Sequence, residues 1–121
     1  MPRTGARIAP PNSSITFDNP ELSHVFIDLS WDEVAKYIVA TPESIQATAD
    51  LINRHPDRFL FGTDEVAPAD QSKYLKVYDL YQPLFAKLTP EASGELKKGN
   101  YERLFDEARS RVRAWEKINV K

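Results

Sequence analysis

The 121-residue chain is long enough for one domain but too short for a complete (β/α)8 barrel, which needs about 250 residues. Its 41% hydrophobic content predicts a folded core, and its net charge of −2 gives no broad electrostatic reason to bind nucleic acid or a membrane surface. Cysteine is absent, which excludes disulfides and thiolate metal sites. Neither a secretory signal nor a membrane-spanning apolar run is evident, so we expect a cytoplasmic protein.

Residues 1–23 are predicted to form a proline-rich N-terminal arm, and residues 24–121 the folded region. Proline removes backbone donors and disfavours helix at the residue before it. Two interpretations of the arm stay open: it docks as an extended segment through Ile15 and Phe17, or much of it is mobile.

The segment from His24 to Leu29 is predicted to form the first strand. Its apolar side chains fall on both faces, which is typical of a parallel strand covered on both sides. Ser30 and Glu33 have capping-box spacing, so a short helix is expected with Ser30 as its N-cap. The apolar stripe of that helix is expected to be Val34, Tyr37 and Ile38.

A second helix is predicted to begin at Thr41 and Pro42, because threonine is a good N-cap and proline suits the first helical position. Its buried face is expected to be Ile45, Thr48, Ala49 and Ile52. A second strand follows over about residues 58–62. Strand, helical crossover and strand make a parallel β-α-β unit, so the predicted fold class is α/β, with two parallel strands and a helix-rich C-terminal half.

The pattern after the second strand is helical. Asp70 is expected to cap a long helix that Pro83 kinks or breaks. The packing side of that helix is predicted to be Tyr74, Val77, Tyr78, Tyr81, Phe85 and Leu88. A short helix from Thr89 is expected to stop at Gly99, and Asn100 to cap the last helix. The apolar stripe of the last helix is Leu104, Phe105, Ala108, Val112 and Trp115.

Asp64 is the candidate functional residue. It follows the second predicted strand, and in parallel α/β folds chemistry collects at the carboxyl ends of the strands. Leu60, Gly62 and Asp64 should share one face of that strand. The alternative is that Asp64 merely caps its own turn through the backbone.

Two motifs resemble one known family. The first reads R-F-L-F-G-T-D at residues 58–64, and the second reads G-N-Y-E-R-L-F at residues 99–105. In this order they resemble the C-terminal end of the amidohydrolase-related family of metal-dependent hydrolases and decarboxylases. The resemblance covers roughly residues 24–108 and implies a partial (β/α)8-barrel-like fold. It also implies that Asp64 binds a divalent metal, zinc or a similar ion, and takes part in catalysis by helping to deprotonate the attacking water.

The other metal ligands of that family have no counterpart in this sequence. His24 and His55 are the two histidines, and both precede their strands, on the order of 20 Å from Asp64 at about 3.3 Å per residue. A zinc site with three protein ligands therefore cannot be assembled within the chain. We expect no cofactor on this chain alone, and no catalytic competence without further ligands.

Two interpretations of function stay open. The chain is either the C-terminal portion of such an enzyme or a non-catalytic α/β interaction or scaffold domain that self-associates. A two-stranded sheet leaves both outer edges unpaired, so we expect a homo-oligomer or a complementary barrel fragment as partner. Nucleic acid and membrane are not expected partners, and no residue indicates a substrate.

Overall fold

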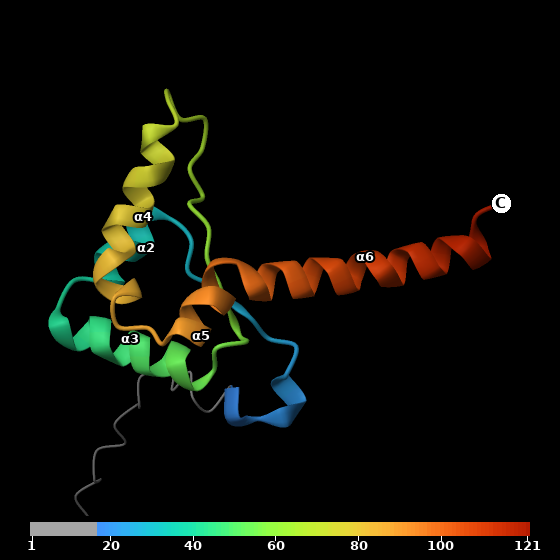
Figure 1. The fold of residues 1–121 in the computed structure, drawn as a ribbon, viewed down its shortest axis with the longest axis horizontal. Helices are drawn as coiled ribbons and strands as arrows, with labels where there is room; N and C mark the ends of the chain where they lie inside the picture. Colours follow the sequence, from blue (N-terminus) through green and yellow to red (C-terminus); the bar gives the residue numbers. More distant parts are fainter. Residues whose placement is uncertain (1–16) are drawn as a thin grey trace, which may run out of the picture.

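The computed structural model describes residues 17–121, in which helices predominate over two short strands (Figure 1). In chain order the elements are η1 (Pro20–Leu22), β1 (Ile27–Asp28), α2 (Asp32–Ile38), α3 (Pro42–Arg54), β2 (Phe59–Leu60), α4 (Ser72–Phe85), α5 (Pro90–Gly94), η2 (Glu95–Gly99) and α6 (Asn100–Asn119). Of these, η1 is a 3-10 helix and η2 a π-helix. The α/β class with a helix-rich second half is confirmed.

The two strands pair in parallel, with Ile27 opposite Phe59 and Asp28 opposite Leu60. Hydrogen bonds of 2.9 Å continue the ladder at both ends. Helices α2 and α3 form the connection between the strands, so the predicted β-α-β unit is confirmed. Both strands are shorter than the apolar runs that predict them.

The start of α3 follows the sequence pattern. The hydroxyl of Thr41 accepts the N–H of Ser44 at 3.0 Å, and the Ser44 hydroxyl accepts the N–H of Thr41 at 3.1 Å. Reciprocal bonds of this kind satisfy donors that the first helical turn leaves without partners. On the predicted buried face, Ala49 and Ile52 are fully buried.

The predicted start of α2 is wrong. The hydroxyl of Ser30 donates to the carboxylate of Asp28 instead of capping the helix, and Trp31 occupies the N-cap position without a side-chain bond. The predicted stripe is also wrong in part, because Tyr37 is 79% exposed and Ala35 is the buried residue. The nearby carboxylate therefore outcompetes the capping interaction that the spacing suggests.

The described end of the N-terminal arm is docked. Phe17 is buried, and the guanidinium of Arg58 lies 4.7 Å from the centre of its ring. Arg58 donates to the carbonyl oxygen of Val25 at 2.8 Å and also to that of Leu22. Phe17 therefore packs into the core, but residues 17 and 18 are helical and not extended as predicted. Ile15 and the other residues before Phe17 lie outside the described part of the chain.

Helix α4 packs through aromatic rings against Phe61, which follows β2. The ring of Phe61 lies 5.1, 4.9 and 5.1 Å from the rings of Tyr78, Tyr81 and Phe85, each edge to face. Tyr81 and Phe85 are buried as predicted, whereas Tyr74 and Tyr78 at the outer side are each 38% exposed. The aromatic spacing therefore predicts the packing side correctly for the C-terminal half of α4.

The ends of α4 agree with the sequence to within a residue or two. The carboxylate of Asp70 accepts the N–H of Ser72 at 2.8 Å and also its hydroxyl. The hydroxyl bond is the main reason that the pKa of Asp70 is lowered. Pro83 lies in the last turn, and the helix ends two residues later at Phe85.

The predicted break between α5 and α6 is wrong. Gly99 and Asn100 both have helical backbone angles, and the π-helical turn η2 carries α5 directly into α6. Asn100 is fully buried, and its amide donates to the carbonyl oxygens of Pro56 at 2.7 Å and Phe59 at 2.8 Å. Its own oxygen accepts from Arg103 at 2.9 Å. Asn100, which the sequence pattern predicts to cap the last helix, instead bonds through its side chain to the segment around β2.

Helix α6 extends away from the rest of the molecule (Figure 1). Its apolar stripe is present, but most of it is not covered. Phe105, Val112 and Trp115 are 52%, 53% and 60% exposed, and Leu104 is half-buried. The predicted stripe therefore lacks a packing partner within residues 17–121.

Candidate functional site

Asp64 lies where the sequence places it, beyond the carboxyl end of β2. Its side chain is exposed, and its φ of 49° is in the left-handed region that aspartate adopts more readily than most residues. Within residues 17–121 its carboxylate makes no hydrogen bond or ion pair, so the alternative role as a cap of its own turn finds no support. The carboxylate is available to another group.

The carboxyl end of β1 lies beside that of β2. Asp28 accepts the N–H of Ser30 at 2.9 Å and also its hydroxyl, which orders the loop after β1. A methyl group at position 62 would lie 3.1 Å from the Ser30 hydroxyl oxygen, so glycine allows the two loops to approach closely. Asp28 therefore shapes this end of the sheet through local bonds.

The hydroxyl of the buried Tyr81 also bonds to the loop after β1. The hydroxyl of Tyr81 donates to the carbonyl oxygens of Leu29 and, at 2.8 Å, Trp31. Trp31 has a φ of 92°, which is unfavourable for a bulky residue and persists only where the surroundings fix it. Burial, and then the negative charges of Asp28 and Asp32, raise the pKa of Tyr81 to about 12. Sequence periodicity assigns Tyr81 to the core but does not reveal this role.

A small polar hollow lies next to these loops. It has a volume of about 220 Å³ and is lined by Asp32, Glu65, Lys73, Lys76, Val77 and Leu80. The two carboxylates and two ammonium groups that line it leave a net charge near zero, so the hollow suits a small polar group better than a strongly charged one. Glu65 lines the hollow and Asp64 does not.

The two histidines lie away from Asp64 in the chain. His55 ends α3, with its Nε2 3.6 Å from a carboxylate oxygen of Asp18 and its ring 5.2 Å from the ring of Phe17. His24 is exposed ahead of β1. Among residues 17–121 no cluster of three or more His, Cys, Asp or Glu side chains could hold a metal ion. The described donors therefore do not fit a complete divalent metal centre.

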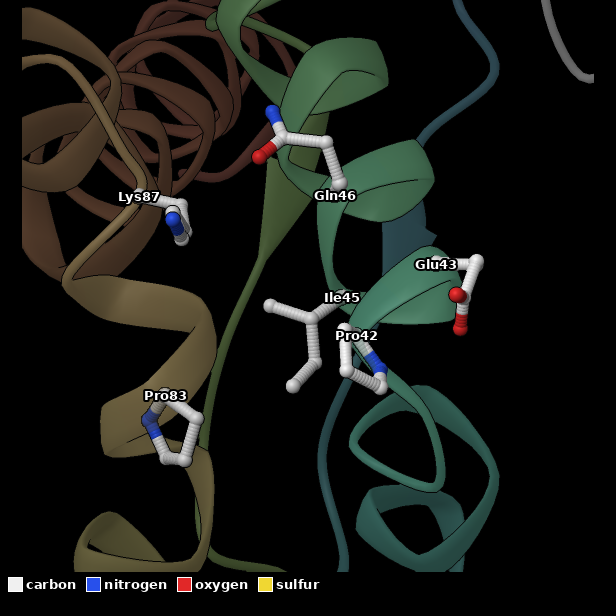
Figure 2. Close-up of a pocket in the computed structure, with 6 residues that line it drawn as sticks. All are labelled: Pro42, Glu43, Ile45, Gln46, Pro83 and Lys87. Atoms are coloured by element: carbon white, nitrogen blue, oxygen red, sulfur yellow. The ribbon is translucent and has the colours of Figure 1, made fainter.

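A larger groove lies between α3 and α4 (Figure 2). It has a volume of about 580 Å³ and is lined by Pro42, Glu43, Ile45, Gln46, Pro83 and Lys87. Figure 2 shows the Ile45 side chain between the two helices, with Glu43 pointing away from Pro83. No lining residue belongs to the loop after β2, so the groove is separate in sequence from the site around Asp64.

No helix within residues 17–121 combines the length and the apolar character needed to cross a bilayer. Comparison with protein-family models, curated proteins and solved structures finds no match to this chain.

Proposed function

We propose that this chain is the C-terminal portion of an amidohydrolase-related metal-dependent hydrolase or decarboxylase. In this proposal Asp64 supplies one metal-binding and catalytic carboxylate, and the other ligands come from outside the chain. The observation that carries the proposal is the place of Asp64, exposed and without a partner among the described residues, at the carboxyl end of a parallel strand.

The two-stranded sheet supports the proposal that additional polypeptide completes this fold. Within residues 17–121 β1 and β2 pair only with each other. The carbonyl oxygen of Phe59, on the outer edge of β2, accepts from Asn100, so β1 carries the edge that a further strand could join. Two-stranded sheets are marginal alone, and unpaired edges invite further strands. A complementary segment that adds strands beside β1 would also bring new side chains to the carboxyl end of the sheet. The cytoplasmic location expected from the sequence belongs to this proposal as well.

A second candidate is the non-catalytic interaction domain. The exposed apolar side chains of α6 favour it, because large apolar patches on soluble proteins commonly mark interaction sites. The two candidates differ in what they require of Asp64: the enzyme needs its carboxylate, whereas the interaction domain does not.

Metal analysis of the purified chain tests the claim that the other metal ligands lie outside it. We expect far less than one zinc, manganese or iron per chain after dialysis against a weak chelator, because Asp64 has no co-ligands among the described residues. Elemental analysis of the wild type and of Asp64→Asn should give the same low values. One tightly held ion per wild-type chain that Asp64→Asn loses would contradict the claim that the other ligands lie outside this chain.

A further inference from the structure

The apolar side chains of α6 recur with alternating spacings of four and three residues. We call the resulting row the α6 seam: Tyr101, Phe105, Ala108, Val112, Trp115 and Asn119. Alternating spacings of four and three residues are the pattern of the contact positions in two helices that supercoil around each other.

The α6 seam is exposed along its length. Its larger apolar members are all more than half exposed, and the helix that carries them points away from the body (Figure 1). At the end nearest the body the rings of Tyr101 and Phe105 lie 4.4 Å apart, so the first turn already presents a continuous aromatic surface. Side chains of this size are rarely left in a contiguous exposed row.

We propose that the α6 seam pairs in parallel with the α6 seam of a second copy of this chain. Charges beside the seam favour this partner. In a parallel pair, the residue just before a seam position faces the residue five positions further along the other helix. Arg111 precedes the seam residue Val112, so it faces Glu116 of the second copy. Symmetry repeats this pairing of opposite charges. Glu116 also contacts Arg113 of its own helix at 2.6 Å, an exposed pair that leaves room for a second cation.

The opposite orientation is disfavoured by the same residues. In an antiparallel pair with fully overlapping seams, Arg109 and Arg111 would each lie near their own counterparts, and Glu102 near Glu116. These contacts all join like charges. In the parallel pair Asn119 would face Asn119 at the last turn of α6, where its amide also donates to the carbonyl oxygen of Trp115 at 2.8 Å. Charge placement thus selects the parallel dimer.

Analytical ultracentrifugation of the purified chain and of matched variants tests whether the α6 seam forms a dimer. We expect a concentration-dependent dimer, and Val112→Glu should raise its dissociation constant at least about tenfold, because a carboxylate would be buried in the seam. Ser110→Glu places the same charge on the outer face of α6 and should leave dimerisation unchanged. A wild-type chain that stays monomeric, or equal effects of the two variants, would overturn the proposal without touching the role of Asp64.

Cysteine cross-linking tests the orientation, since the natural chain has no cysteine. Asn119→Cys should form a disulfide-linked dimer under mild oxidation, because the two copies of this position meet in the parallel pair. Lys117→Cys, on the outer face, should remain largely unlinked. Absence of the Asn119→Cys cross-link in a chain that sediments as a dimer would overturn the parallel arrangement.

Discussion

Asn100→Ala is expected to lower the free energy of unfolding by about 3 kcal/mol. The side chain is fully buried, and its amide satisfies the carbonyl oxygens of Pro56 and Phe59. Alanine would leave both oxygens without this donor and open a small cavity. Arg103 would also lose one acceptor and keep its bond of 3.1 Å to the carbonyl of Asp57. The loss should loosen the contact between β2 and the η2–α6 helix.

Urea unfolding of the wild type and of two variants measures this effect. Ser110→Ala, on the exposed outer face of α6, is the control and should change stability by no more than about 0.5 kcal/mol. If Asn100→Ala were as stable as the control, the amide would not be what attaches β2 to the helix.

Tyr81→Phe is expected to cost about 1–3 kcal/mol of stability, because the carbonyl oxygens of Leu29 and Trp31 would lose their shared donor. The unfavourable backbone of Trp31 depends on the same bonds, so the loop after β1 should also become more mobile. Hydrogen exchange over residues 29–32 would report that loosening. Tyr74→Phe, at a half-exposed position on α4, serves as the control for loss of a hydroxyl.

The stabilisation from Tyr81 should also depend on pH. Its pKa is raised to about 12 in the fold, whereas an unfolded tyrosine titrates near about 10. The unfolded state therefore loses this proton first as the pH rises. The contribution should be complete below pH of about 10 and disappear as the pH approaches about 12. Unfolding midpoints of the wild type and Tyr81→Phe should converge over that range, and a constant difference would argue against the assignment.

Local chemistry predicts the first half of the fold well. The capping box of Thr41 and Ser44 and the apolar run around Phe59 depend on residues that are close in sequence. The start of α3 and the strand β2 both form as predicted. Ser30 fails as a cap because Asp28, two residues earlier, offers its hydroxyl a better acceptor. Spacing alone cannot rank two such local competitors.

The second half depends more on contacts between distant residues. Gly99 and Asn100 together are typical of a helix end and a new helix start, yet Asn100 bonds to a segment more than forty residues earlier, and the helix continues. No local pattern encodes that pairing. Similarly, the period of α6 predicts an apolar stripe but not what covers it. At the candidate site, the sequence predicts that Asp64 follows β2, but not that the strand ends at Leu60 or that Asp64 has a positive φ. The bonds from Tyr81 and the positive φ of Trp31 arise from tertiary packing.

The central claim is that Asp64 is one ligand of a metal centre whose other ligands lie outside this chain. Native mass spectrometry with elemental analysis, on material purified from the source cells, tests it most directly. The account predicts a larger species, either a longer polypeptide or a complex with a complementary chain, that holds a divalent metal. Asp64→Asn should keep the mass of that species and lose the metal. A native species made of this chain alone and free of metal, or a metal content that Asp64→Asn leaves unchanged, would contradict the account.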